Sequence, residues 1–249
     1  MNERLAVSVA DMDDLDIELL DAFIARRAPA LLAVGSREEA AIRLGLLAKV
    51  SPRVVPTMVG LYLFGKAPQL VFPEWGLGCA AFAGTSIDAP VARRADAEGP
   101  LASLLEAGLA FVCSHSGTAD DPAASEYPEA VVREILTNAL VHRDLRKSSR
   151  VLLRLFTDRL EVWSPGGPPE GVTDLEELSR EGGLSQPRNP LLAASSRVLG
   201  LSEQLGRGLA LLSRASTAGA RIEIRSSPRD VLVIVPSRWQ RPRAGEALS

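Results

Sequence analysis

The order of helices and strands beyond residue 126 constrains the fold of this chain more than any other feature. One helix is followed by two pairs of strands, with further helices between the pairs. Helices interleaved with an antiparallel sheet predict an α/β (α+β) fold, a two-layer α/β sandwich. The predicted ranges are 128–142 for the first helix, 174–178 and 190–199 for later helices, and 151–156, 159–163, 220–225 and 231–236 for the strands.

The first half of the chain is predicted to form a smaller, mainly helical region. Ser36 followed by Glu39 is a capping box, in which each side chain satisfies a free backbone N–H at the start of a helix. The segment 89–99 is polar and is predicted to be a loop. The other expected elements are helices at 14–27, 36–48, 58–64 and 101–113 and a strand at 78–85.

A turn-rich segment at 114–125 marks the expected boundary between two domains. Its sequence, SHSGTADDPAAS, combines the Gly, Pro, Ser and Asp residues that favour turns. We therefore expect an N-terminal region at 1–118, a second domain at 126–238 and a flexible tail at 239–249.

One short segment is similar to a phosphate-binding loop, and this interpretation is rejected. Residues 60–67 read GLYLFGKA, close to the pattern G-x-x-x-x-G-K-[ST]. A phosphate loop needs a hydroxyl after the lysine to bind Mg²⁺, and Ala67 stands there instead. The interior residues Leu-Tyr-Leu-Phe favour burial, so a core helix that ends at Gly65 is predicted.

Composition excludes several classes of protein. Hydrophobic residues make up 46% of the 249 residues, which is enough for a core and excludes a wholly disordered chain. Cys79 and Cys113 are too few for a disulfide framework or a metal cage. The net charge of -3 does not indicate a nucleic-acid or membrane partner, and no apolar run is long enough to span a membrane. The N-terminus has no signal-peptide pattern, so a cytoplasmic location is expected.

The helix at 128–142 carries the strongest candidate for a functional site. Glu134, Asn138 and His142 are spaced i, i+4 and i+8, so they share one polar face of the helix. The opposite face is apolar. Asn is unfavourable in the middle of a helix, which indicates a role for Asn138, although a solvated outer face explains the same pattern.

Two glycine-rich segments follow this helix in the sequence. Gly166 and Gly167 come directly after a strand, where glycine lets a ligand approach the backbone. Gly206 and Gly208 lead into a helix, whose free N–H groups and dipole favour an anion. Each motif alone is weak evidence for phosphate binding, and their order after an E-x-x-x-N helix is more specific.

With these motifs the chain resembles the GHKL ATP-binding fold that gyrase B, Hsp90, MutL and histidine kinases share. It is more similar to the C-terminal half of bacterial RecG-like transcriptional regulators, through YPEAVVREILTNALVHRDL, DRLEVWSPGGPPEGVT, RNPLLA and GLSEQLGRGL. The resemblance covers about residues 10–236 and is strongest at 127–210. It implies a sandwich of the GHKL (Bergerat) type that binds ATP and Mg²⁺.

The resemblance implies a role for each site residue. Asn138 would bind Mg²⁺ and, through it, the phosphates, and Glu134 would be the general base that orients the attacking water. His142 stands where some relatives hold a charged group near the nucleotide. The remaining implied contacts are Ser164, Gly166 and Gly167 on the adenine side and Gly206, Arg207 and Gly208 on the phosphate side.

The chain departs from the family pattern at two places. The family generally uses an Asp to accept the adenine amino group, and Ser164, a shorter and neutral residue, stands at that position. The regulators usually carry a Schlafen/AlbA-type DNA-binding domain in front, and the sequence has no counterpart to its core. Direct DNA binding is therefore weakly supported, and region 1–118 is interpreted as a linker remnant that serves dimerisation or partner docking.

The sequence leaves three functions open. The first is a nucleotide-binding regulatory protein in transcriptional regulation, with slow or no hydrolysis; helicase motor motifs are missing from the sequence. The second is a degenerate GHKL fold that no longer binds ATP and acts as a protein-interaction or dimerisation scaffold. The third is an ATPase that couples hydrolysis to dimer closure. The expected partners are an adenine nucleotide and either a second copy of the chain or another protein, with no membrane partner.

Overall fold

The computed structural model describes residues 3–115, 126–168, 187–201 and 222–238. Its centre is a six-stranded sheet of order β4-β3-β5-β6-β8-β7. β3 and β5 are parallel, and all other neighbouring strands are antiparallel. The strands are β3 (Leu77–Phe82), β4 (Val91–Ala97), β5 (Val151–Leu155), β6 (Arg159–Pro165), β7 (Glu223–Ser226) and β8 (Asp230–Pro236).

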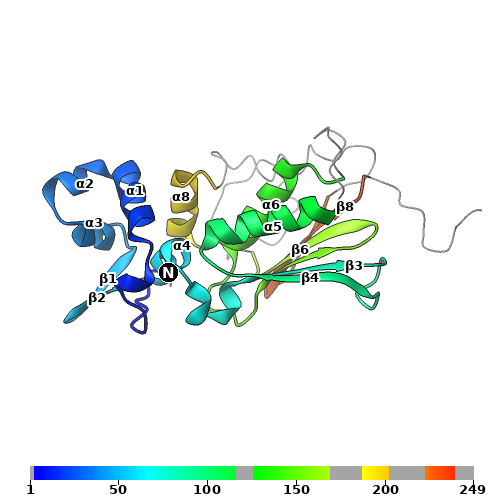
Figure 1. The fold of residues 1–249 in the computed structure, drawn as a ribbon, viewed down its shortest axis with the longest axis horizontal. Coiled ribbons are helices and arrows are strands. Elements are labelled where there is room, and N and C mark those ends of the chain that lie inside the picture. Colours follow the sequence, from blue (N-terminus) through cyan, green and yellow to red (C-terminus); the bar gives the residue numbers. More distant parts are fainter. Residues whose placement is uncertain (1–2, 116–125, 169–186, 202–221, 239–249) are drawn as a thin grey trace, which may run out of the picture.

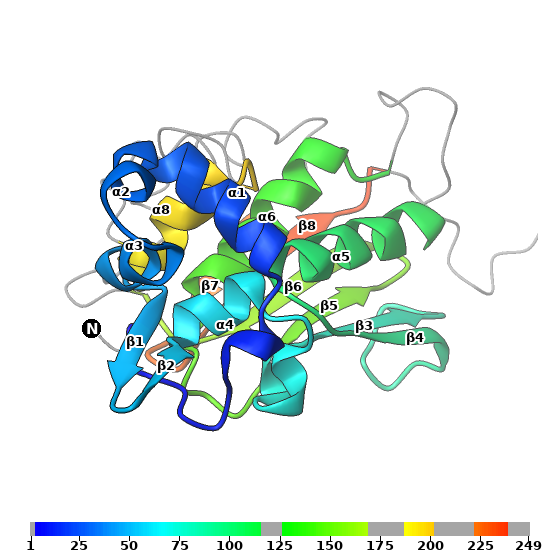
Figure 2. The ribbon, with the colours of Figure 1, turned by 60° about the vertical axis from the view of Figure 1, so that its left-hand side comes forward.

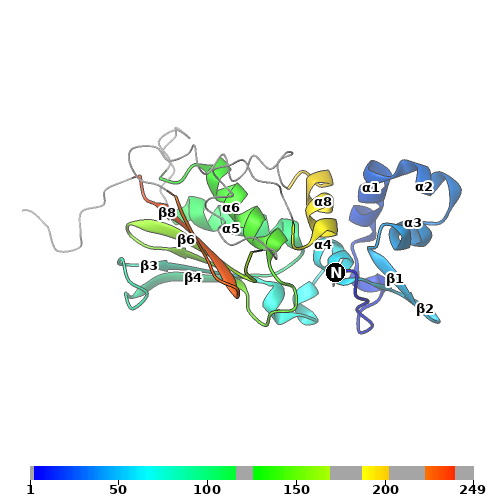
Figure 3. The same ribbon diagram turned by 180° about the vertical axis from the view of Figure 1, so that it is seen from behind.

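Two long helices cover one face of this sheet. α5 (Leu101–His115) and α6 (Glu129–His142) lie on the same side of the strands in Figures 1 and 3. β3 and β5 alternate buried and half-buried residues along their length, because successive side chains of a strand lie on opposite faces. The predicted two-layer α/β sandwich is confirmed. No helix among the described residues is both long and apolar enough to cross a membrane.

Shorter elements lie at one end of the sheet. α4 (Met58–Phe64) and α8 (Pro190–Val198) lie between the sheet and the first helices of the chain (Figures 1 and 2). The predicted helical N-terminal region is present. Its other elements are η1 (Met12–Asp14), α1 (Ile17–Arg27), α2 (Pro29–Val34), α3 (Arg37–Arg43), the hairpin of β1 (Leu47–Val50) and β2 (Arg53–Pro56), η2 (Pro68–Leu70) and η3 (Pro73–Trp75).

Local sequence rules explain where several helices begin and end. Asp16 accepts a hydrogen bond from the N–H of Leu19 (3.0 Å) at the start of α1. Ser36 accepts from the N–H of Glu39 (3.2 Å), and the Glu39 carboxylate accepts from the N–H of Ser36 (2.9 Å), which confirms the capping box. Every residue of α4 is buried and Gly65 follows its end, so the segment similar to a phosphate loop is a core helix, as predicted.

The predicted helix at 36–48 is too long. α3 ends at Arg43, and Gly45 has a φ of 77°, a left-handed conformation that turns the chain out of the helix. The chain then enters the hairpin, with Leu47 opposite Pro56. The prediction was wrong because a short apolar run fits a helix and a strand equally well.

The segment 89–99, predicted to be a loop, contains strand β4. β4 pairs with β3, with Cys79 opposite Ala95. It is the edge strand of the sheet and most of its residues are exposed. Charged residues such as Arg93 and Arg94 are typical of edge strands, because charge discourages pairing with another chain. This polarity caused the wrong prediction of a loop.

The sheet contains strands from both sides of the predicted domain boundary. β3 and β4 precede it and β5 to β8 follow it, and β3 pairs directly with β5, with Leu77 opposite Val151. The segment 116–125 and the tail 239–249 lie outside the described residues. The division into 1–118, 126–238 and 239–249 stays a prediction, as do the helices at 174–178 and beyond Gly206.

Candidate functional site

α6 brings two of the predicted site residues into contact. Nδ2 of Asn138 donates a hydrogen bond to Oε1 of Glu134, one turn earlier (2.8 Å). Both side chains are half-buried. The polar face of α6 is therefore partly enclosed, and its polar groups bond to each other. The opposite face is buried in the core through Val132, Ile135, Leu136, Ala139 and Leu140.

His142 lies one further turn along α6, at its C-terminal end. Burial and, after it, the positive charges of Arg188 and Arg197 lower the pKa of His142 to about 4. The imidazole is therefore neutral at pH 7. It can share a hydrogen bond with a ligand at that pH, but it supplies no charge.

Ser164 joins the end of β6 to the middle of α6. Its hydroxyl is buried and donates a hydrogen bond to the carbonyl oxygen of Ala139 (2.8 Å). Because the proton is used in this bond, the hydroxyl oxygen can act toward a ligand only as an acceptor. An amino group of a base could donate to it, without the help of a negative charge.

The turn at Gly166 and Gly167 packs closely against the protein itself. Gly166 has a φ of 102°, and a Cβ there would come within 2.9 Å of the Cβ of Asp144. A Cβ on Gly167 would overlap the carbonyl oxygen of Ser227. Close approach inside the protein therefore explains why both positions hold glycine.

Asp144 and Arg188, which are not among the predicted site residues, hold this turn. The N–H of Asp144 donates to the carbonyl oxygen of Pro165 (2.7 Å), and its carboxylate accepts from Nε and Nη2 of Arg146 (3.1 Å each). Arg188 donates to the carbonyl oxygen of Gly167 and lies 3.8 Å from the Asp144 carboxylate. Burial alone would raise the pKa of Asp144, but the hydrogen bonds from Arg146 and the charge of Arg188 outweigh burial and lower it.

Asn189 connects α8 to α6. Its buried Nδ2 donates to the carbonyl oxygens of Val141 (2.8 Å) and Arg143 (2.9 Å), at the end of α6, where carbonyl groups lack partners within the helix. The available signal was the Asn before Pro190, because both residues favour the start of a helix. The partners of Asn189 lie 48 and 46 residues earlier in the chain, which no local pattern reveals.

The phosphate-facing residues implied by the resemblance, Gly206, Arg207 and Gly208, lie outside the described residues. Among the described residues, Asn138 has an amide oxygen and Glu134 a carboxylate, which are ligands of the kind that Mg²⁺ prefers. The described part of the chain has no group of three His, Cys, Asp or Glu side chains that could hold a metal.

Comparison with known proteins bears on the second half of the chain. Residues 148–234 match the family model described as "Putative ATP-dependent DNA helicase recG C-terminal". No curated protein matches the chain. The crystal structure of the DIP2311 protein from Corynebacterium diphtheriae is similar in fold, with a TM-score of 0.66 and 23% sequence identity. The match covers 95% of this chain and 47% of that chain, so this chain spans about half the length of that protein.

The matched family is of the HATPase type, an ATP-binding domain family, which supports nucleotide binding. The match includes β5, β6, the turn at Gly166 and Gly167, and α8, while α6 with Glu134 and Asn138 lies just before it. Residues 148–234 are therefore similar to the C-terminal domain that this family model describes.

Proposed function

We propose that the protein binds an adenine nucleotide with Mg²⁺ at the polar face of α6 and acts as a regulatory switch with slow or no hydrolysis. The observation that carries the proposal is the hydrogen bond between Asn138 and Glu134 on a half-buried face, beside an HATPase-type domain. Ser164 reaches the same stretch of α6 through Ala139, the residue after Asn138. Ser164, on the proposed adenine-base side of the site, is thus joined to Asn138, on the proposed metal side, through the adjacent residue Ala139.

On the metal side, Asn138 would bind Mg²⁺ through its amide oxygen, because its amide nitrogen already donates to Glu134. The bound ion would neutralise charge on the phosphates. Glu134 would hold the attacking water, since a general base must lie within hydrogen-bonding distance of the water that it orients. The hydrogen bond from Nδ2 of Asn138 holds the Glu134 carboxylate directly beside this proposed metal ligand.

On the base side, Ser164 would accept a hydrogen bond from the amino group of adenine. Asp144 lies against Gly166, but its carboxylate is engaged by Arg146 and Arg188, so it does not replace the acid that the family generally uses. A single neutral acceptor gives limited discrimination between bases. We therefore expect modest selectivity for adenine over guanine.

The regulated process is proposed to be transcription, and the protein to be cytoplasmic. The proposal of transcription rests on the resemblance to RecG-like regulators. Region 1–118 would contact a second copy of the chain or another protein. Direct DNA binding is not part of the proposal.

One observation favours the scaffold as a second candidate function. Ser164, Gly166 and Gly167 are each explained by packing within the protein, without a ligand. A fold that had lost nucleotide binding could retain all three residues for stability. Binding therefore has to be measured.

Thermal unfolding with Mg-ATP, Mg-ADP and Mg-GTP tests the proposal. A ligand stabilises the folded protein by RT ln(1 + [L]/Kd), so a nucleotide at 100 times its Kd adds about 2.7 kcal/mol. Asn138→Ala should lose this stabilisation, and Asn138→Asp should keep part of it because Asp retains an oxygen ligand. No stabilisation of the wild type by any of the three nucleotides at millimolar concentration would contradict the proposal and favour the scaffold.

Hydrolysis is tested separately on α6. Glu134→Gln should keep nucleotide binding and abolish any phosphate release. Glu129→Gln is the matched control, because Glu129 is an exposed glutamate at the start of the same helix. A Glu134→Gln variant that releases phosphate at the wild-type rate would exclude Glu134 as the general base.

A further inference from the structure

Glu3 places a buried carboxylate at the start of α8. Its Oε1 accepts a hydrogen bond from the N–H of Leu191 (2.9 Å), and its Oε2 accepts one from the N–H of Leu192 (3.0 Å). Glu3 is only 3% exposed. The first N–H groups of a helix lack partners within it, and the helix dipole favours an anion there, so one side chain satisfies both requirements. The partners are 188 and 189 residues apart in the sequence.

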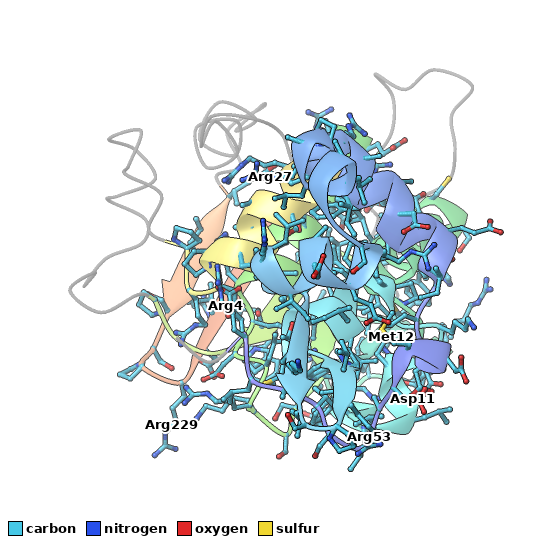
Figure 4. The ribbon with its side chains drawn as sticks, turned by 90° about the vertical axis from the view of Figure 1, so that its left-hand side faces the viewer. Arg4, Asp11, Met12, Arg27, Arg53 and Arg229 are labelled. Carbon is cyan, nitrogen blue, oxygen red and sulfur yellow. The ribbon has the colours of Figure 1, made fainter. Side chains whose placement is uncertain are left out.

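Main-chain hydrogen bonds hold the segment around Glu3. The N–H of Val59 donates to the carbonyl oxygen of Glu3 (3.0 Å), and the N–H of Val7 donates to the carbonyl oxygen of Pro56 (2.8 Å). Figure 4 views this end of the molecule, where Arg4, the residue after Glu3, lies beside α8. The N-terminal segment is thus fixed along the start of α4, in a position from which the Glu3 carboxylate reaches α8.

Residues just before α8 connect the position of this helix to the proposed site. Asn189, immediately before α8, donates to two carbonyl oxygens at the end of α6, and Arg188 donates to the carbonyl oxygen of Gly167. The two residues whose N–H groups bind Glu3 are therefore close neighbours in sequence of the residues that hold α6 and the glycine turn. Asn138 is three residues before Val141, one of the carbonyl groups held by Asn189.

We propose that Glu3 is a positioning residue of the nucleotide site. Its carboxylate fixes the start of α8 and, through Asn189 and Arg188, the end of α6 and the turn at Gly166–Gly167. The ligand in this inference rests on the proposed function, whereas the link from Glu3 to α6 does not. A partner that displaces the N-terminal segment would accordingly weaken nucleotide binding at a distance.

The first test measures binding of Mg-ATP by calorimetry to the full chain and to Glu3→Gln. Gln keeps the shape of the side chain but loses the charge and one acceptor, so we expect Kd to rise about 2- to 30-fold, the range seen for residues that act on a site from a distance. Glu18→Gln is the matched control, because Glu18 is an exposed glutamate in the first turn of α1. Equal Kd values for wild type and Glu3→Gln would overturn the inference.

A double-mutant cycle separates positioning from a general loss of stability. Asn189→Ala removes one of the two contacts through which Glu3 is proposed to act, and the bond from Arg188 to Gly167 remains. Because part of the effect of Glu3 passes through Asn189, the double variant Glu3→Gln/Asn189→Ala should raise the Kd for Mg-ATP by less than the two single variants combined. Additive increases in Kd would overturn the inference.

Hydrogen exchange keeps the inference testable if the proposed function fails. In the absence of nucleotide, Glu3→Gln should speed amide exchange in the first turn of α8 and also in the last turn of α6, and Glu18→Gln should change neither. If the wild type binds none of the nucleotides but this pattern is found, the link stands and the proposed function fails. Faster exchange in α8 with unchanged exchange in α6 would overturn the link.

Discussion

The hydroxyl of Ser164 donates a hydrogen bond to the carbonyl oxygen of Ala139, 2.8 Å away, and joins the end of β6 to the middle of α6. Ala139 follows Asn138, so the same bond fixes the distance between the proposed base side and the proposed metal side of the site. Asn189 and Arg188 add bonds from the start of α8 to α6 and to the glycine turn. The geometry of the proposed site therefore depends on the hydrogen bonds that join β6, α6 and α8.

Ser164→Ala should lower the free energy of unfolding by about 1–3 kcal/mol, because the buried carbonyl oxygen of Ala139 would lose its side-chain donor. Urea unfolding of the two proteins measures the difference. Ser148→Ala, at an exposed serine, is the control and should change stability by less than about 0.5 kcal/mol. Equal stability of Ser164→Ala and the wild type would show that this bond contributes nothing.

Gly166→Ala should destabilise the protein more than Gly200→Ala. Both glycines have positive φ, 102° and 74°, so both substitutions strain the backbone. Only at Gly166 would the new Cβ also press on Asp144, since none of the described residues lies within 4 Å of a Cβ at Gly200. The difference between the two variants isolates the steric contact, which should cost about 1–3 kcal/mol. Similar unfolding free energies for the two variants would contradict the packing at Gly166.

Stability should fall between about pH 6.5 and pH 4 because of His142. Burial and the neighbouring arginines lower its pKa from 6.5 to about 4, so the unfolded chain binds a proton before the folded chain as the pH falls. At pH 7 both states are neutral and His142 has no effect. Below pH 4 both are protonated, and the accumulated loss reaches at most about 3 kcal/mol.

Urea unfolding across this pH range checks the effect of His142. In His142→Asn the fall in stability should be shallower by that amount than in the wild type. An identical pH profile for His142→Asn and the wild type would mean that His142 titrates normally.

Asn189→Ala should cost about 1–3 kcal/mol, since it removes the donor shared by Val141 and Arg143. Asn189→Asp should cost more, because a carboxylate cannot donate and would face the two carbonyl oxygens at the negative end of the α6 dipole, which outweighs its favourable charge before α8. Thermal unfolding ranks the two variants. Greater stability of Asn189→Asp than Asn189→Ala would contradict the assigned role as donor.

Features encoded by neighbouring residues were predictable from the sequence. The capping box of Ser36 and Glu39 and the contact of Asn138 with Glu134 both follow from helical spacing over three or four residues. The strand pairs around the turns at 157–158 and 227–229 follow from alternating apolar residues and turn signals. These local rules were sufficient to predict the two-layer sandwich and the contact between Glu134 and Asn138.

Features that depend on tertiary contacts were not predictable. β4 was missed because its charged residues suit an exposed sheet edge, which a sequence without its sheet does not reveal. Glu3 and Asn189 act on partners far away in the chain, and nothing around either residue marks those partners. The sequence predicts that the glycines of the turn let a ligand approach the backbone, and the contacts of this turn with Asp144 and Ser227 were not predictable.

Calorimetric titration of Mg-ATP into the wild type and into Asn138→Ala tests the nucleotide site most directly. Thermal unfolding without nucleotide first establishes that the variant is folded. We expect saturable heat with the wild type and none, or a greatly raised Kd, with Asn138→Ala. Equal binding by the two proteins, or no heat from the wild type at millimolar Mg-ATP, would contradict a nucleotide site built on Asn138.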